Sequence, residues 1–273
     1  MSAADVRSMH AYVDAFEQSV RSLLEVVETL DEEQWRRPTE CPGWTVLDQV
    51  AHVVALERQF LGEDAPQTLD DYGQHVRNGA GQHMEDGIAA LRGLGPGALV
   101  EALRDALGRR LDALRATELD PAALTPGVLG NDIPVGRFWP VRVFDVWAHE
   151  QDVRRAVGRP GNLAGPAADV ARDRVALALP YVVGRVVAPP PGTIVAFDVS
   201  GETPLPLTVS VGPDGRGSGV PGIAGSATAT LRTDWETMSR LACGRIDPAT
   251  AGVTVEGDAE LGRRVLANLA VTP

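Results

Sequence analysis

The sequence predicts two domains of different class, an all-α domain followed by a smaller α+β domain. Through the first two thirds of the chain, apolar residues recur at three- and four-residue spacings, as they do on the buried face of a helix. A proline-rich run from Ala188 to Gly192 interrupts this pattern, and short β-branched segments follow it. We therefore expect the domains to span residues 1–187 and 188–273, each long enough to bury a core.

Two helices are predicted near the N-terminus. The first spans Asp5–Leu30, where apolar residues share one stripe. The second begins after Thr45 and runs to about Leu61, because Thr45 and Asp48 have the spacing of a capping box. The polar, glycine-rich stretch 63–97 that follows fits either a broken helix or a mobile loop.

A leucine stripe over 99–114 and an apolar run over 138–157 predict two more helices, and four helices are enough for an antiparallel bundle. The pattern over 169–183 predicts another helix before the proline-rich run. Beyond it the expected strands are Thr193–Val199, Leu207–Val211, Ala227–Thr233 and Gly252–Glu256, and the expected helices are Asp234–Cys243 and Asp258–Leu269.

Composition and charge exclude several classes of protein. Acidic residues outnumber basic ones, 37 to 25, and the net charge of −12 repels nucleic acid and anionic lipid. The N-terminal residues lack a secretion pattern, and no apolar run reaches the length of a membrane span. We therefore expect a cytoplasmic protein with no nucleic-acid or membrane partner, as a monomer or weak homodimer.

Several cysteines and histidines carry no clear chemical signal. The two cysteines are far apart and lie in no CxxC motif, so neither a disulfide framework nor a thiolate zinc site is supported, and Cys41 is expected to be structural. His10, His75 and His83 lie in segments expected at the surface. None of these residues is assigned as a ligand.

The segment around residue 150 holds the most informative pattern. Asp145 and His149 are four residues apart and therefore project from one face of the predicted helix, and Asp152 follows on that face. Their neighbours are mostly apolar, which places this helix in the interior. A buried carboxylate requires an ion pair, a hydrogen-bond network or a metal ion.

His52 supplies a partner for this pair, because it lies mid-helix among valines that should face the core. Two imidazoles and one carboxylate are a common ligand set for zinc or a similar divalent ion, with a fourth position left for water or substrate. Asp48, one turn earlier, is a candidate acceptor that would orient His52. The spacing alone fits a structural interpretation equally well. In that interpretation Asp145 and His149 form a hydrogen-bonded pair, and His52 is a core histidine whose ring nitrogens are hydrogen-bonded.

Three segments resemble the mycothiol-dependent maleylpyruvate isomerase family. They read CPGWTVLDQVAHVVALE from residue 41, VFDVWAHEQDVRRAVGRPG from residue 143 and TLRTDWETMSRLACGRIDPATAGVTVEGDAELGRRVLANLAV from residue 230. The resemblance covers nearly the whole chain. It implies a four-helix bundle of the DinB type followed by a smaller domain similar to sterol-carrier proteins.

The resemblance also implies a set of site residues. A divalent metal, usually zinc, would be held by His52, Asp145 and His149, although the family has glutamate where this chain has Asp145. An arginine of the C-terminal domain acts in the family, and its match is Arg245, with Arg240 as the weaker candidate. Arg245 also fits a plain structural role, because a cation at a helix C-terminus satisfies terminal carbonyls.

The reaction implied is addition of the mycothiol thiolate to the double bond of maleylpyruvate, rotation, and loss of the thiolate to give the trans isomer. Arg245 would bind a substrate carboxylate or the thiol, and Asp152 or Glu150 would carry a proton. The partners expected are a low-molecular-weight thiol and a small electrophile. Two alternatives remain at this point: a mycothiol S-transferase, and a non-catalytic ligand carrier with a structural metal.

Overall fold

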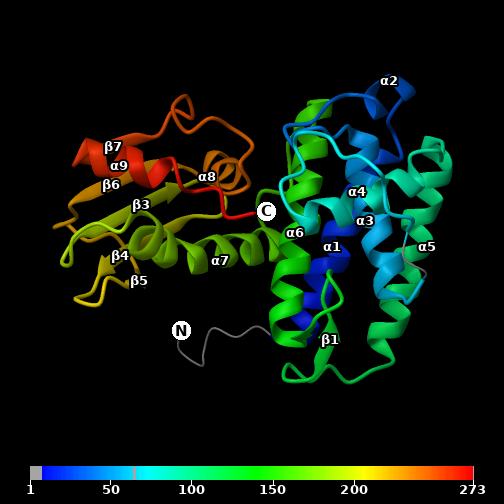
Figure 1. Cartoon of the computed structure of the whole chain (residues 1–273), viewed down its shortest axis with the longest axis horizontal. Coiled ribbons are helices and arrows are strands. Elements are labelled where there is room, and N and C mark those ends of the chain that lie inside the picture. Colours follow the sequence, from blue (N-terminus) through cyan, green and yellow to red (C-terminus); the bar gives the residue numbers. More distant parts are fainter. Residues whose placement is uncertain (1–7, 64–65, 273) are drawn as a thin grey trace. The chain divides into compact units, whose positions relative to one another are not determined.

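The structure is a computed structural model that describes residues 8–63 and 66–272 (Figure 1). Contacts divide the chain into two compact units, one extending to Asn162 and the other spanning Leu163–Thr272. The first unit is helical and the second contains a five-stranded sheet. The predicted order of an all-α part followed by an α+β part is confirmed.

Four long helices of the first unit form a closed ring. Helix α1 contacts α5 and α6, and α3 contacts the same two helices from the opposite side. Aligned apolar stripes bury the centre of this ring, where Phe16, Val50, Leu103 and Val146 are inaccessible to solvent. The bounds are Met9–Val27 for α1, Val46–Phe60 for α3, Pro96–Arg115 for α5 and Val135–Val157 for α6.

The first two predicted helices are confirmed with shifted ends. Positions 5–7 of the first prediction lie outside the described residues, and α1 ends at Val27 rather than Leu30. Helix α3 begins with the expected capping box: the Asp48 carboxylate accepts the Thr45 amide at 2.8 Å, and Thr45 Oγ1 accepts the Asp48 amide. A short helix that was not predicted, α2 (Glu32–Trp35), lies between them.

The stretch that fitted either a broken helix or a loop contains the helix α4 (Gly79–Leu91), which packs on α3. Asn78 caps its first turn. The two helices lie very close together, because a Cβ atom on Gly87 would stand 2.9 Å from that of Ala55. The glycines that obscured the helix in the sequence are what allow this approach.

A small hairpin leads into the last helix of this unit. Strands β1 (Leu124–Pro126) and β2 (Asp132–Pro134) pair antiparallel, and α6 starts directly after them, three residues earlier than predicted. Pro140 lies within α6, which the prediction did not account for. Its ring removes one amide donor from the helix, and α6 nevertheless continues to Gly158, whose left-handed conformation ends it.

In the second unit, a five-stranded sheet has the order β5-β4-β3-β6-β7, with β3 and β6 parallel and the other pairs antiparallel. Its buried face carries Val195, Phe197, Val209 and Leu231. The strands are β3 (Ile194–Ser200), β4 (Leu205–Val211), β5 (Gly217–Pro221), β6 (Ala229–Asp234) and β7 (Thr254–Gly257). The helices are α7 (Pro166–Tyr181), the π-helical turn η1 (Val182–Val187), α8 (Trp235–Ala242) and α9 (Ala259–Leu266).

Two details of the second unit differ from expectation. The boundary between units falls after Asn162 rather than at 187/188, because α7 packs on β4, β5 and α8 of the second unit. Strand β5 was not predicted, since its glycine and serine residues lack the β-branched character that marks the other strands.

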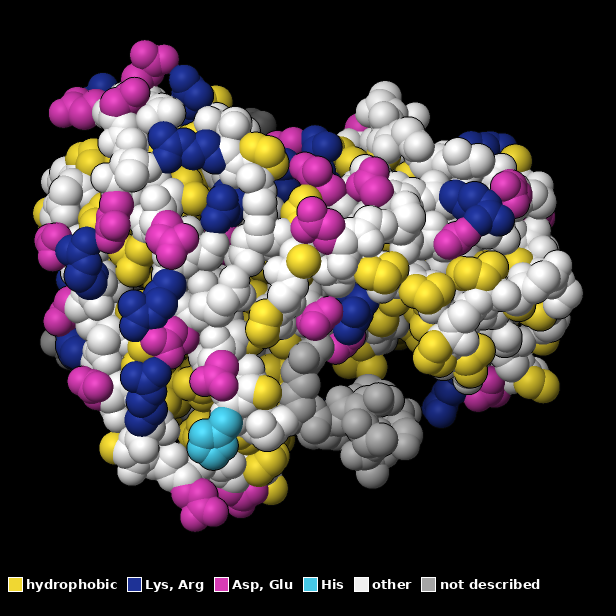
Figure 2. Space-filling view, turned by 180° about the vertical axis from the view of Figure 1, so that it is seen from behind, with side chains coloured by type: hydrophobic (Ala, Val, Ile, Leu, Met, Phe, Trp, Pro, Cys, Tyr) yellow, Lys and Arg dark blue, Asp and Glu magenta, His cyan; other side chains and the backbone are white. Residues whose placement is uncertain are grey.

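Charged side chains cover the surface without forming a single basic area on the face that Figure 2 shows, where acidic and basic groups are interspersed. This distribution agrees with the net charge of −12. Within the described residues, no helix combines the length and hydropathy needed to cross a bilayer.

Candidate metal centre

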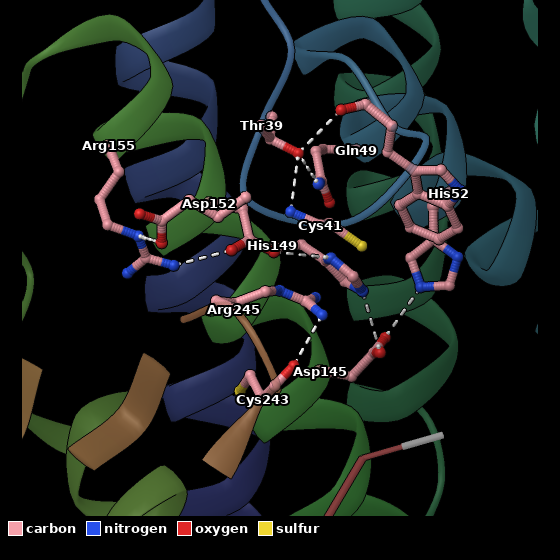
Figure 3. A network of polar contacts seen from close by, with 12 residues as sticks. Thr39, Cys41, Gln49, His52, Asp145, His149, Asp152, Arg155, Cys243 and Arg245 are labelled. Atoms are coloured by element: carbon pink, nitrogen blue, oxygen red, sulfur yellow. Dashed lines mark hydrogen bonds and ion pairs between the residues drawn. The ribbon is translucent and has the colours of Figure 1, made fainter. Parts of the chain in front are cut away.

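The structure brings His52, Asp145 and His149 together inside the helical unit (Figure 3). One oxygen of Asp145 lies 3.3 Å from His52 Nε2, and its other oxygen lies 3.3 Å from His149 Nε2. One possible ligand atom from each residue lies within 4.8 Å of the other two. The two histidines are buried, at 3% and 7% exposure, whereas Asp145 is 29% exposed, so the cluster has an accessible side.

Helices α3 and α6 place these residues. His52 lies in the middle of α3, and Asp145 and His149 stand one turn apart on α6, on the side that packs against α3. The rings of His52 and His149 meet edge to face with centroids 4.5 Å apart. Convergence of two helix faces thus produces the cluster, as the four-residue spacing predicted.

Trp44 forms a wall of the cluster that sequence reasoning missed. Its ring centroid lies 5.1 Å from that of His52 and 5.4 Å from that of His149. Its indole nitrogen donates to Glu85 of α4 at 2.6 Å, and the same carboxylate binds His75 and Arg92. A buried carboxylate therefore fixes the indole against both candidate ligands.

A buried charge network supports Asp145 from behind and was also missed. Arg142 contacts the Asp145 carboxylate and donates through Nε to Glu57 at 2.6 Å. Arg110 donates to the other oxygen of Glu57 at 2.8 Å. All three members of this network are at least nine-tenths buried, so their charges are compensated inside the protein rather than by water. The only signal in the sequence was the i,i+3 spacing of Arg142 and Asp145 on one helix.

Asp152, predicted as a proton carrier, lies beside His149. Its carboxylate oxygen is 3.6 Å from His149 Nδ1, just beyond hydrogen-bond length, and it accepts from Arg155 at 2.7 Å. Arg155 in turn binds Glu40 at 2.8 Å. Glu150, the other candidate, faces away from the cluster and accepts from Ser19, Ser22, Arg154 and Asn162, which is a structural role.

The cluster sets the protonation of its own members. Burial lowers the pKa of His52 to about 4, so its imidazole is neutral at physiological pH. Burial would raise the pKa of Asp145, but His52 and Arg142 outweigh it and hold that pKa well below its usual value. For His149, burial opposes the charged form, yet Asp145 and Asp152 prevail and raise its pKa.

These residues fit a divalent metal ion. The neutral imidazole of His52 and the ionised carboxylate of Asp145 are already in their ligating forms. Two nitrogen donors and one oxygen donor match a catalytic zinc set that leaves one position for a further ligand. Three convergent donors around a compact space are the observation on which this assignment stands.

Some sequence assignments near the cluster were wrong. Asp48 does not orient His52, because its carboxylate accepts from Thr45 and from Arg92 at 2.8 Å. His75 and His83 are not surface residues: both are partly buried, the first bound to Glu85 and the second to Gln59. The short spacing of Asp48 and His52 favoured a contact that the capping box prevents.

Arg245 belongs to the second unit, directly after α8. Its guanidinium donates to the carbonyl of Cys243 at 2.8 Å, which is the helix-terminal role considered as an alternative in the sequence. Arg240, the weaker candidate, lies in the last turn of α8.

Comparison with known families shows two matches along the chain. Residues 16–154 match the mycothiol maleylpyruvate isomerase N-terminal domain, and residues 169–264 match the C-terminal domain of the same family. The first match contains all three residues of the candidate metal centre, and the second contains Arg245. Together the two domains cover both structural units.

Individual relatives agree at lower similarity. Uncharacterised proteins from two strains of Mycobacterium tuberculosis are 27% identical over 135 residues, 49% of this chain, and the chain spans about half their length (51%). Crystal structures of a mycothiol-dependent maleylpyruvate isomerase and of its histidine-to-alanine mutant superpose with a TM-score of 0.58, at 17% and 16% identity. Each covers 94% of this chain and 96% of its own, and this likeness concerns the fold.

Proposed function

Because this chain belongs to the mycothiol maleylpyruvate isomerase family, we propose that it is a divalent-metal-dependent enzyme that uses mycothiol to isomerise maleylpyruvate or a related unsaturated acid from cis to trans. The observation that carries the proposal is the cluster of His52, Asp145 and His149. Zinc is the metal that this donor set favours. When bound, it supplies positive charge that lowers the pKa of a coordinated thiol toward neutrality.

The protein's own residues prepare this chemistry. Asp145 contributes a fixed negative charge that Arg142 and Glu57 hold in place. The Trp44 ring packs against both imidazoles and helps to bury them. Asp152 lies 3.6 Å from His149 Nδ1, and its negative charge helps to raise the pKa of His149.

The reaction balances without any other reagent. The thiolate sulfur adds to one carbon of the double bond, and the electron pair moves to the adjacent carbonyl as an enolate. Rotation about the new single bond follows, and the enolate then expels the thiolate to restore the double bond in the trans form. We assign Arg245 to a substrate carboxylate, since a guanidinium binds such a group through two parallel hydrogen bonds.

Incubation of the zinc-loaded protein with mycothiol and maleylpyruvate tests the proposal. We expect the ultraviolet spectrum to change to that of the trans isomer while the concentration of free thiol stays constant. His149→Ala should abolish this conversion, whereas Glu101→Gln, an exposed change on α5, should not. Steady consumption of the thiol would instead identify an S-transferase and contradict the proposal.

A further inference from the structure

A cavity of about 140 Å³ lies between α3 and α4, next to the candidate metal centre. Its walls come from both helices and from the segment after α3, and they combine apolar residues with polar ones, among them His52, Arg58 and Glu63. This volume is close to that of an engineered cavity that binds benzene, so a ligand of about six to ten non-hydrogen atoms fits. The apolar lining residues are Ala55, Leu56, Met84, Gly87, Ala90 and Leu91.

His52 lines this cavity and has one ring nitrogen that no hydrogen bond within the described residues uses. Its Nε2 faces Asp145, whereas its Nδ1 has no hydrogen-bond partner among residues 8–63 and 66–272. A histidine that binds a metal through one nitrogen normally donates its other N–H to a carboxylate, carbonyl or water. The Asp48 carboxylate already accepts hydrogen bonds from Thr45 and Arg92, so a molecule in the cavity could supply the acceptor instead.

Arg58 adds positive charge to the same cavity. Its one ion pair in the described part of the chain is with Glu63 at 3.8 Å, and Glu63 is held more closely by Arg109, at 2.6 Å. The other polar residues of the lining, Gln59 and His83, are paired with each other at 2.7 Å. The guanidinium of Arg58 is therefore the lining group best able to take up a new anionic partner.

We propose that this cavity binds a small α,β-unsaturated carboxylic acid, with the carboxylate on His52 Nδ1–H and Arg58 and the apolar chain between α3 and α4. The inference rests on the proposed function, because it names the part of the molecule that receives the electrophile. The apolar part of the lining, on Ala55, Leu56 and Met84, accommodates the carbon chain of such an acid.

Calorimetric titration of the zinc-loaded protein with crotonate, without any thiol, tests this inference. Crotonate is a four-carbon unsaturated acid, and crotonamide has the same shape without the charge. We expect crotonate to bind more tightly than crotonamide. Arg58→Gln should weaken the binding of crotonate and leave that of crotonamide unchanged, because only the acid gains from a charged donor.

A matched pair of variants locates the binding. Ala90 is exposed at the rim of the cavity, so Ala90→Leu should fold normally and obstruct it, whereas Ala89→Leu changes the neighbouring residue outside the lining. We expect Ala90→Leu to weaken crotonate about tenfold or more, and Ala89→Leu to leave it unchanged.

Three results would overturn the inference: no binding to the wild-type protein, equal binding of crotonate and crotonamide, or equal affinity in Ala90→Leu and wild type. Thermal melting of both variants shows that they are folded. Because the titration contains no thiol and no turnover, its failure would leave the proposed isomerase activity standing. A failed turnover assay would equally leave the binding result intact.

Discussion

The carboxylate of Glu57 on α3 binds two arginines, Arg142 on α6 and Arg110 on α5, and this buried arrangement joins the three helices. Arg142 and Arg110 donate to separate oxygens of Glu57, at 2.6 and 2.8 Å. Arg142 also contacts Asp145, so the position of a candidate ligand depends on a residue outside the ligand set. Removal of one member leaves uncompensated charge in the interior.

Glu57→Gln should therefore destabilise the helical unit by about 3 kcal/mol, because its amide group cannot accept from both arginines. Urea unfolding of the metal-free protein, followed by far-ultraviolet circular dichroism, measures this loss. Glu101→Gln is the control, since its pair with Arg104 is exposed and should contribute less than about 1 kcal/mol. Equal effects of the two changes would show that the network is not structural.

The protonation of His149 should govern how metal binding depends on pH. Its pKa is raised above the ordinary histidine value, and a metal binds only the neutral imidazole. Below that pKa one proton must leave, so the affinity for zinc should fall about tenfold per pH unit, and above it the affinity should level off. His52, with a pKa of about 4, adds to this loss only in strong acid.

Asp152→Asn should move the break in this profile to lower pH, because Asp152 helps to raise the pKa of His149. Competition with a chromophoric chelator at a series of pH values measures it. Glu40→Gln is the matched control, since Glu40 binds Arg155 rather than His149, and the break should stay in place. An unmoved break in Asp152→Asn would show that Asp152 does not control His149.

At the residue scale, the sequence predicted the cluster of His52, Asp145 and His149 but little of what supports it. The proximity of Asp145 and His149 was predictable because helical spacing alone places them on one face. The contacts of Trp44 and Glu57 were not, because they join segments far apart in the sequence and no local spacing connects them. Burial of charge through distant partners is a property of the packed bundle.

At the scale of elements, strand β5 and the turn η1 meet through glycine. A Cβ atom on Gly217 would lie 2.1 Å from the carbonyl oxygen of Pro180, and one on Gly184 would lie 2.2 Å from the amide nitrogen of Gly217. Backbone therefore packs directly on backbone, and no side chain fits between them. This contact was not predictable, since β5 is rich in glycine and serine and α7 continues into η1 through Pro180.

Gly217→Ala should destabilise the second unit by about 3 kcal/mol, because the backbone of α7 at Pro180 must move to admit the methyl group. Gly225→Ala is the control: a Cβ atom there meets nothing within 4 Å, and the change should stay within about 0.5 kcal/mol. Thermal unfolding of both variants compares them. Similar melting temperatures would contradict the close packing.

Helices with strong apolar periodicity were predicted well, and elements rich in glycine were not. Helix α3 begins at its predicted capping box, because the signal is local. The sequence did not distinguish helix α4 from a loop, although this helix carries Glu85 and one wall of the cavity beside His52. Its stability comes from close packing on α3, which the sequence does not display.

At the scale of the whole molecule, the two units match two domains of one family, and the candidate metal centre lies entirely within the first. The order of domain classes was predictable, because helical apolar periodicity gives way to short β-branched segments along the chain. Their boundary was not, because the helical pattern of α7 resembles that of the first unit while its contacts belong to the second.

The metal content of the purified protein tests the central claim most directly. After incubation with zinc and removal of the excess, elemental analysis should find about one equivalent per chain. His52→Ala should lose nearly all of it, and His10→Ala, a change at an exposed histidine of α1, should retain it. A wild-type protein that binds no zinc, or a His52→Ala protein that binds as much as wild type, would contradict the account.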